Sequence, residues 1–165
     1  MMENYRILIY GYGNPGRRDD GLGPALVNLV EKWIEIENIS NISVDSNYQL
    51  NIEDAYTIHN FDLVIFADAT VEDIENFMLS RVLPSSKTDF TMHSVHPAFV
   101  LDLCTQLYEK VPDVFLLHLK GYDFELKEGL TKRAEENLKE AFHYVREILV
   151  NPVKDIQINK VINTI

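Results

Sequence analysis

The stretch RILIYGYGNPGRRDDGLGPAL, residues 6–26, determines the fold that we expect for this chain of 165 residues. Residues 6–10 form an apolar, β-prone run that stops at Gly11, which is typical of a buried strand. Beyond Asp20, apolar residues recur at helical spacing, namely Leu22, Ala25, Leu26, Leu29, Val30 and Trp33. Asp19 or Asp20 supplies a residue of the type that caps helix N-termini. The stretch therefore predicts a strand, a glycine loop and a helix, in that order.

The rest of the chain continues this alternation of strands and helices. Short apolar runs predict strands at residues 42–45, at residues 63–67 (ending at Asp68) and at residues 114–119. Helical spacing predicts a helix over 98–108, opened by Pro97, and another from Thr131 onward. We therefore expect an α/β fold of three layers, in which a mostly parallel twisted sheet of about five strands carries helices on both faces. Residues 1–150 are predicted to form one domain, and residues 151–165 a tail of uncertain structure.

Composition and charge exclude several classes of protein. Apolar residues make up 46% of the chain and charged residues 25%, as in ordinary globular domains. The formal net charge is −11 and the cations are scattered, which argues against nucleic-acid binding. The N-terminus lacks the features of a signal peptide, and no run of about 20 apolar residues predicts a membrane span. Cys104 is the only cysteine, so no internal disulfide forms, and a reducing cytoplasm is the expected compartment.

The segment Gly11–Gly16 (GYGNPG) has two further interpretations that the neighbouring residues weaken. It matches the G-x-G-x-x-G pattern of dinucleotide sites, but Pro15 and the carboxylates of Asp19 and Asp20 are unsuited to a phosphate cradle. It also resembles the start of bacterial peptidyl-tRNA hydrolases. That resemblance implies a catalytic histidine–asparagine pair, where this chain has Asp19-Asp20-Gly21 instead. A nucleotide-binding module and a peptidyl-tRNA hydrolase-like esterase remain the alternatives.

Three polar residues follow predicted strands or precede the next helix. They are Asp20, after the first strand, Asp68, after the strand at 63–67, and His93, just before Pro97. Ligand sites of open α/β sheets lie beyond the carboxyl ends of the strands. Two carboxylates and one imidazole suit nickel, zinc, cobalt or manganese. Each residue also has a structural interpretation: Asp20 as a helix cap, Asp68 as a turn residue, and His93 as a structural histidine.

Five blocks, in order, resemble the maturation endopeptidases of nickel–iron hydrogenases. The first is Gly11-Tyr12-Gly13-Asn14 followed by Asp19-Asp20-Gly21-Leu22-Gly23, and the second is Gln49-Leu50 with Glu53. The third is Asp68-Ala69, and the fourth is His93-Ser94-Val95-His96-Pro97 through Leu101. The last is Gly121-Tyr122-Asp123-Phe124-Glu125-Leu126 with Glu128-Gly129-Leu130-Thr131. Together the blocks extend over about residues 6–149.

The resemblance implies a phosphorylase/hydrolase-like α/β fold and a specific reaction. Members of the family remove a C-terminal extension from the hydrogenase large-subunit precursor after nickel insertion. Carried over by motif, Asp20, Asp68 and His93 are the metal-contacting and catalytic residues, and the nickel is supplied by the substrate. His96 stands where the family usually has serine, so it is a second candidate for the histidine ligand, although it can equally cap the helix that follows. We expect a monomeric, cytoplasmic peptidase of the aspartic or metal-dependent type.

The remaining chemistry-bearing residues have weaker signals. No G-x-S-x-G or H-E-x-x-H motif occurs, so serine-hydrolase and zincin mechanisms lack their parts. Cys104 is expected to be a buried apolar residue. Arg17 and Arg18 are either attractants for a substrate carboxylate or solvated cations, and Gln49 and Glu53 either line the cleft or lie on the surface. The sequence shows no partner for His59, His118 or His143.

Overall fold

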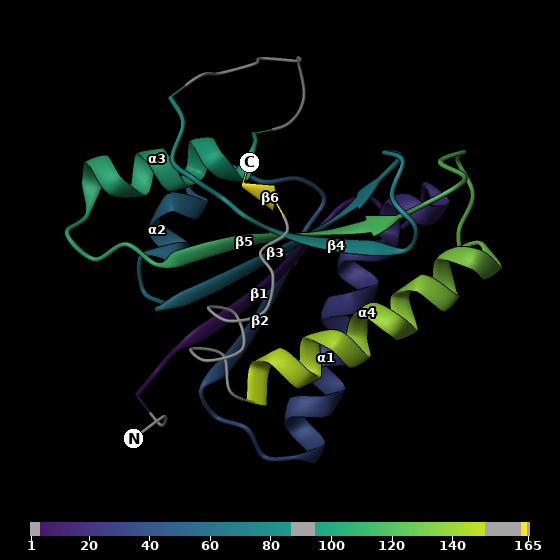
Figure 1. Ribbon diagram of the computed structural model, residues 1–165, viewed down its shortest axis with the longest axis horizontal. Helices are drawn as coiled ribbons and strands as arrows, with labels where there is room; N and C mark the ends of the chain where they lie inside the picture. The colour runs from purple at the N-terminus through teal and green to yellow at the C-terminus, as the bar shows by residue number, and fades with distance from the viewer. Residues whose placement is uncertain (1–3, 87–94, 151–162, 165) are drawn as a thin grey trace.

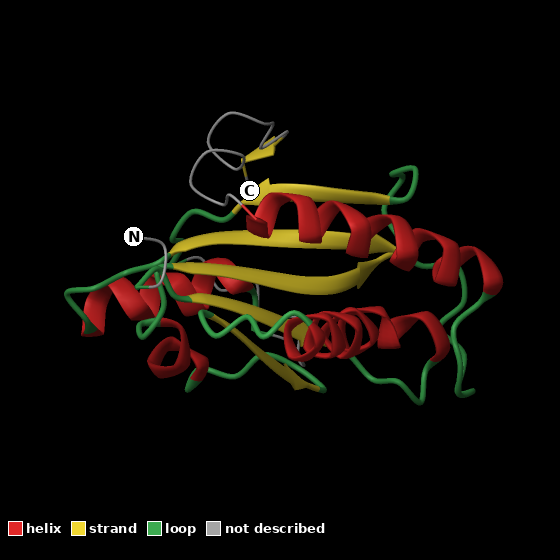
Figure 2. Cartoon of the chain, turned by 90° about the horizontal axis from the view of Figure 1, so that it is seen from below, coloured by secondary structure: helices red, strands yellow, loops and turns green. Residues whose placement is uncertain are grey.

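The computed structural model describes residues 4–86, 95–150 and 163–164, and it contains one six-stranded sheet. The strands are β1 (Ile7–Tyr12), β2 (Ile42–Asn47), β3 (Leu63–Thr70), β4 (Phe77–Arg81), β5 (Asp113–Lys120) and β6 (Asn163–Thr164). Their order across the sheet is β2-β1-β3-β5-β4-β6. Neighbouring strands are parallel except for β4, which is antiparallel to β5. The predicted mostly parallel α/β sheet is confirmed (Figure 2).

Helices cover both faces of the sheet (Figure 1). A 3-10 turn, η1 (Arg18–Gly21), leads into α1 (Leu22–Ile36), and the other helices are α2 (Asp54–Ile58), α3 (Pro97–Leu107) and α4 (Lys132–Val150). Helices α1 and α4 pack on one face, and α2 and α3 on the other. No helix in the described parts of the chain is long and apolar enough to cross a bilayer.

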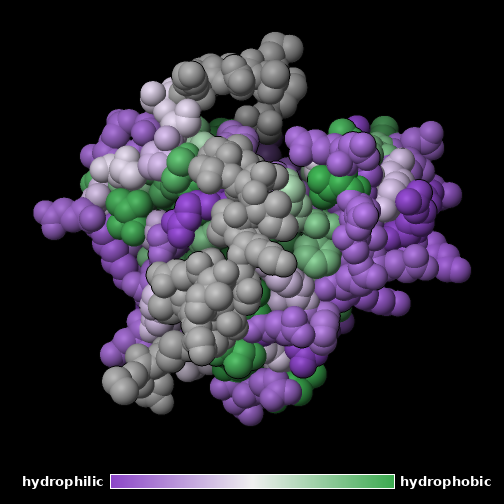
Figure 3. Space-filling view, viewed as in Figure 1, coloured by the Kyte–Doolittle hydropathy of each residue, from purple (hydrophilic) through white to green (hydrophobic). Residues whose placement is uncertain are grey.

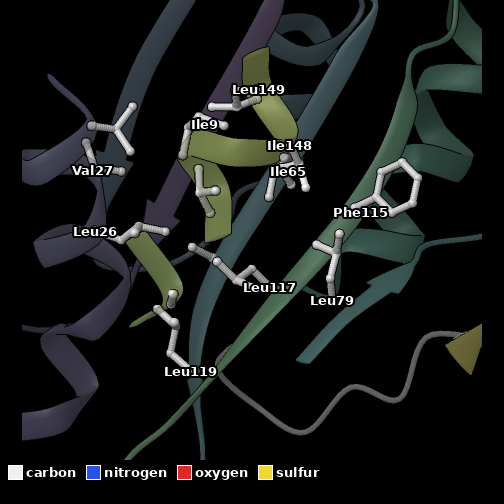
Figure 4. Packing of buried hydrophobic residues seen from close by; sticks show 14 of the residues in the cluster. Ile9, Leu26, Val27, Ile65, Leu79, Phe115, Leu117, Leu119, Ile148 and Leu149 are labelled. Carbon is white, nitrogen blue, oxygen red and sulfur yellow. The ribbon is translucent and has the colours of Figure 1, made fainter. Parts of the chain in front are cut away.

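The alternation of side chains along the strands divides the core into two clusters. On the α1/α4 face, Ile9, Ile65 and Leu117 are fully buried against Leu26 and Leu149 of the helices (Figure 4). On the α2/α3 face the intervening residues of the same strands pack against the other two helices. Successive strand residues point to opposite faces, so a strand covered on both sides is apolar throughout. This explains why the continuous apolar runs in the sequence identify the central strands.

The structure differs from the sequence prediction in four elements. Strand β1 does not stop at Gly11 but continues to Tyr12, because both residues keep pairing with β2. Strand β3 continues to Thr70, so Asp68 lies within the strand and not at its end, because Asp68, Ala69 and Thr70 keep pairing with β5. Strand β4 and the five-residue helix α2 were not predicted. Strand β4 is short and only partly buried, so its sequence carries little periodicity, and its pairing with β5 determines its structure.

Candidate active site

The glycine loop brings backbone segments into direct contact at the carboxyl ends of β1 and β3. A Cβ atom on Gly11 would lie 2.2 Å from the carbonyl oxygen of Gly23, and one on Gly23 would lie 2.5 Å from that of Ala67. Gly13 has a φ of +142°, and a Cβ there would lie 2.0 Å from the carbonyl oxygen of Asp20. Only glycine permits these approaches. The loop therefore seats Asp20 next to the end of β1.

Asp20 is held in this loop by a backbone hydrogen bond. The N–H of Asn14 donates to Oδ2 of Asp20 at 2.8 Å, and the side chain of Asp20 remains partly exposed. The neighbouring Gly16 N–H donates to Oδ1 of Asn14 at 2.9 Å, so Gly16 belongs to a tight turn and not to a helix N-terminus. This geometry does not resemble a dinucleotide loop, in which the third glycine begins the helix.

Asp19 has a different role from Asp20, although the two are adjacent. Asp19 is fully buried, and its carboxylate accepts hydrogen bonds from the backbone N–H groups of Tyr122, Asp123 and Thr131. The Thr131 hydroxyl donates a fourth hydrogen bond, at 2.8 Å. Asp19 thus fastens the segment between β5 and α4 onto η1. The prediction that Asp19 or Asp20 caps the first helix is wrong, because Gly21 occupies the cap position without a side-chain hydrogen bond.

Asp68 lies on the α2/α3 face of β3, beside Tyr12 of β1. The phenol of Tyr12 donates a hydrogen bond to the Asp68 carboxylate, and the Ala69 N–H donates another. Burial, followed by the negative charge of Asp20, raises the pKa of Asp68 to about 7, against the lowering effect of those two hydrogen bonds. Burial, and then the Asp68 charge, also raises the pKa of Tyr12 well above its usual value.

Asp20 and Asp68 are therefore brought together as the sequence predicted. Their electrostatic coupling means that a proton or a cation shared between them lowers the repulsion. Within residues 4–86, 95–150 and 163–164, no three His, Cys, Asp or Glu side chains form a group that could hold a metal ion. His93, the third predicted ligand, lies outside the described residues, so its position relative to the two carboxylates is not part of the structure.

His96 occupies the cap position of α3. Its Nδ1 atom accepts a hydrogen bond of 3.0 Å from the Ala98 N–H, and Pro97 follows as the first helical residue. Burial lowers the pKa of His96 below its usual value, which favours the neutral ring. With Nδ1 accepting, the neutral ring carries its proton on Nε2, so neither nitrogen offers a free lone pair to a metal. The capping role left open by the sequence is confirmed.

His118 and Ser80 form a buried polar pair that the sequence analysis missed. The Ser80 hydroxyl lies 2.7 Å from Nε2 of His118, and Ser80 is fully buried. His118 is the β5 partner of Asp68, so the two side chains lie on the same face of the sheet. Burial lowers the pKa of His118. The spacing resembles a serine–histidine dyad, but a fully buried hydroxyl does not reach a protein substrate. The signal was available in the alternation of VFLLHL, which puts His118 on the α2/α3 face.

The other candidate residues are placed as follows. Cys104 is fully buried on α3, as predicted, and burial raises its thiol pKa. Arg18 is held by Asp123 at 3.3 Å, whereas Arg17 is exposed beside the site loop. Gln49 and Glu53 are both exposed, beyond the carboxyl end of β2.

The two remaining histidines have partners far along the chain or on the same helix. The His59 ring stacks on Tyr108 with a centroid distance of 3.9 Å. His143 Nε2 lies 3.2 Å from Glu147 on α4. Both contacts are exposed or partly exposed surface interactions, and neither involves Asp20 or Asp68.

Solved structures of hydrogenase maturation proteases share this fold. The HycI protease of Thermococcus kodakarensis is 21% identical, with a TM-score of 0.72 over 88% of this chain and 93% of that protein. The endopeptidase HybD of E. coli is 21% identical, with a TM-score of 0.69 over 89% and 93%. The hydrogenase 2 maturation peptidase of a Thaumarchaeota archaeon is 20% identical, with a TM-score of 0.63 over 87% and 97%.

Comparison of the sequence alone identifies no relative of this chain. No protein-family model matches it, and no curated protein matches it either. The likeness therefore rests on structure, and it extends over most of this chain and nearly all of each neighbour. The chain has the fold of the solved hydrogenase maturation proteases, as the five sequence blocks predicted.

Proposed function

We propose that this protein is a cytoplasmic, monomeric endopeptidase that removes the C-terminal extension of a nickel–iron hydrogenase large-subunit precursor after nickel insertion. The observation that carries the proposal is the pairing of Asp20 and Asp68 at the carboxyl ends of β1 and β3, with the Asp68 pKa raised to about 7. The shared fold supports the same reaction, because the neighbours of known name are hydrogenase maturation proteases.

The nickel ion belongs to the substrate in this proposal. The precursor holds nickel through its own side chains, and Asp20, Asp68 and His93 contact it from outside. Two carboxylates and an imidazole suit such a borderline cation. The coupling of Asp20 and Asp68 gives a reason for selectivity, since a cation relieves the repulsion that an empty precursor leaves in place. A nickel-free precursor therefore docks poorly.

Asp68 also has the proton affinity that peptide hydrolysis needs near neutral pH. A general base works best when its pKa lies near the operating pH, and the Asp68 pKa is about 7 as long as no cation contacts the carboxylate. The roles of base and nickel contact are therefore alternatives for Asp68, because a coordinated nickel ion would lower this pKa. In the proposed reaction, water adds to the scissile carbonyl carbon as Asp68 takes its proton. The C–N bond then breaks, and the proton passes to the leaving amine. The products are the mature subunit with a new carboxylate and the free extension peptide. Tyr12 holds the Asp68 carboxylate in position throughout.

The test is to incubate the purified protein with the large-subunit precursor from the same source, with and without nickel, and to measure intact masses. We expect loss of a short C-terminal peptide only from the nickel-loaded precursor. No mass change with folded, nickel-loaded precursor would refute the proposed activity. Cleavage regardless of nickel would retain the protease and refute nickel recognition.

Variants assign the roles within the site. We expect Asp20→Asn, Asp68→Asn and His93→Ala each to slow cleavage by at least about 100-fold, the lower range for loss of a general base. Asp73→Asn is the matched control, because Asp73 is an exposed acidic residue in the turn after β3. Binding of the nickel-loaded precursor separates the two roles of Asp68. If Asp68→Asn still binds but does not cleave, Asp68 acts as the base, whereas loss of binding identifies it as a nickel contact.

A further inference from the structure

Strand β4 has one side on which a short extended segment, β6, pairs with it. The C-terminal residues of the chain form β6, in which Asn163 pairs with Ser80 and Thr164 pairs with Arg81. The first half of β4, Phe77–Leu79, precedes these pairs. Edge strands expose rows of backbone donors and acceptors that another strand can use. The β4 edge is thus built to accept an extended chain.

The ladder with β5 identifies which residues of β4 face this edge. The Lys120 N–H donates to the Asn76 carbonyl, and the Val82 N–H donates to the Val114 carbonyl, both at 2.9 Å. Hydrogen-bonded pairs alternate along an antiparallel ladder. The backbone groups of Phe77, Leu79 and Arg81 therefore point away from β5, toward the edge.

An open groove of about 580 Å³ lies between the start of β4 and helix α4. Phe77 and Tyr144 form its apolar part, with ring centroids 5.2 Å apart, and Lys139, Glu140 and Glu147 add charged groups. Phe77 lies on the α1/α4 face of the sheet. In a parallel added strand, residues opposite Phe77 and Leu79 point to that same face. The side chain opposite Phe77 would enter the groove, because Phe77 lines it.

On the face seen in Figure 3, the described residues are mainly hydrophilic, and hydrophobic side chains occur there in separate groups and not as one continuous patch. A groove with two aromatic rings beside an edge strand therefore combines the two elements of peptide recognition by strand addition. Backbone hydrogen bonds provide affinity, and pockets for alternate side chains provide specificity.

The direction of β6 relates this edge to the candidate active site. Strand β6 is parallel to β4, so the N-terminal end of an added segment lies near Phe77, at the carboxyl ends of β3 and β5. Met78 is level with His118, which is level with Asp68. Three strand spacings, roughly 14 Å, separate β3 from the added strand, a distance that about four extended residues span. A peptide cut beside Asp68 reaches the β4 edge with its later residues.

We propose that the β4 edge and the adjoining α4 groove bind the C-terminal extension of the precursor as an added parallel strand, competing with the chain's own β6. This rests on the proposed function for the identity of the peptide. The segment after the scissile bond runs along β4 from Phe77 toward Arg81, and the side chain opposite Phe77 enters the groove beside Tyr144. The class of ligand is an extended C-terminal peptide with an apolar or aromatic residue opposite Phe77.

The test uses the full-length protein and a synthetic, fluorescein-labelled peptide with the sequence of the extension, and it measures Kd by anisotropy. Peptides methylated at one backbone nitrogen at a time are compared. Because every second N–H of an added strand points to its partner, we expect at least a tenfold loss of affinity at alternate positions only. A flat profile, or no binding of the unmodified peptide, overturns the proposal.

Protein variants test the groove and the competition. Filling the groove by His143→Trp should weaken peptide binding at least tenfold, whereas Glu135→Trp, at an exposed position of α4 outside the groove, should not. Replacing Asn163 and Thr164 by proline removes backbone donors from β6 and should strengthen peptide binding about threefold. If the His143→Trp variant, the Glu135→Trp variant and the double proline variant all bind the peptide as tightly as the unaltered protein, the proposal is overturned.

Cleavage of the nickel-loaded precursor is measured in parallel. Unchanged cleavage together with a flat methylation profile means that the docking proposal is wrong while the protease activity stands. Alternating peptide binding without any cleavage means that the docking proposal stands and the proposed activity is wrong.

Discussion

The two faces of the sheet differ at the carboxyl ends of the same strands. On the α1/α4 face the ends of β3 and β5 remain apolar, with Ala67 and Leu119 fully buried. On the α2/α3 face a row of polar side chains crosses four strands. The row consists of Tyr12 (β1), Asp68 (β3), His118 (β5) and Ser80 (β4).

The residues that stabilise the fold therefore lie on one face of the sheet, and the residues suited to chemistry lie on the other. The apolar face gains stability from burial and carries no groups that titrate near neutral pH within the cluster. The polar row places a carboxyl group with a pKa of about 7 next to a second carboxylate, which favours neither folding nor packing in the absence of a cation. Residues that cost stability in this way are characteristic of functional sites.

The largest loss of stability is expected from a substitution at Gly23, where the start of α1 contacts the backbone of β1 and β3. In Gly23→Ala, the new Cβ would lie 2.5 Å from the Ala67 carbonyl oxygen and 2.6 Å from that of Tyr12, and neither backbone segment can move independently of the sheet. We expect a loss of more than about 3 kcal/mol in the free energy of unfolding, measured by urea titration. Gly129→Ala is the control, because a Cβ there has open space and only the φ of +89° opposes it. Equal losses would contradict the close packing.

The second test removes packing from the apolar face alone. Ile65 is fully buried between α1 and α4, so Ile65→Ala should cost about 2–5 kcal/mol through lost contacts and a residual cavity. This loss should be the same at pH 5 and pH 8, since no charge is involved. Urea titrations at the two pH values measure it. A loss that changes with pH would show that the two faces are not independent.

The third test changes a residue of the polar row, and it should raise the stability of the protein where the first two tests lower it. Below about pH 4 the Asp68 carboxyl group is protonated in both folded and unfolded chains. As pH rises from 4 to 7, the unfolded chain releases this proton and the folded chain keeps it, so ionisation destabilises the folded state. Asn does not ionise. Asp68→Asn should therefore stabilise the metal-free protein by about 4 kcal/mol at pH 8 and by little at pH 4.

Thermal melts in the presence of a chelator measure this pH dependence. Ile65→Ala provides the contrast within the same strand, because it lowers stability at every pH while Asp68→Asn raises it only above pH 4. A stabilisation by Asp68→Asn that does not change between pH 4 and pH 8 would mean that the Asp68 carboxyl group is not perturbed. The same variant is expected to lose cleavage, which links the stability cost to function.

The sequence predicts the apolar side of this comparison better than the polar side. Long apolar runs and helical spacing identify β1, β3, β5, α1 and α4, because burial on both faces leaves a strong local pattern. Strand β4 leaves no such pattern, since it has only five residues, of which only Leu79 and Ser80 are buried, and they acquire their structure from pairing with β5. Its pairing partner lies more than 30 residues away.

The sequence predicted those site residues whose type and position after an apolar run suggest a ligand site, and it did not predict roles that depend on distant contacts. Asp20 and Asp68 lie close enough to interact, as expected, because the carboxyl-terminal parts of the parallel strands β1 and β3 meet at the same edge of the sheet, although Asp68 lies within β3 and not after it. The contrast between Asp19 and Asp20 was not predictable, since it depends on Tyr122 and Thr131, more than 100 residues away. The face of His118 could be read from the alternation along its strand, but its contact with Ser80 could not, because Ser80 belongs to the strand that the sequence did not predict.

The smallest expected effect concerns His96, at the edge of the polar row. His96→Ala removes the hydrogen bond from the Ala98 N–H, so it should cost about 1 kcal/mol and lower Tm by about 2–4 °C. His96→Asn keeps a capping oxygen and should recover most of that loss. Cleavage of the nickel-loaded precursor should fall only slightly in both variants, because a capping histidine with Nδ1 engaged does not contact the metal. Loss of cleavage as severe as in His93→Ala, without rescue by Asn, would transfer the ligand role to His96 and extend the functional row to the start of α3.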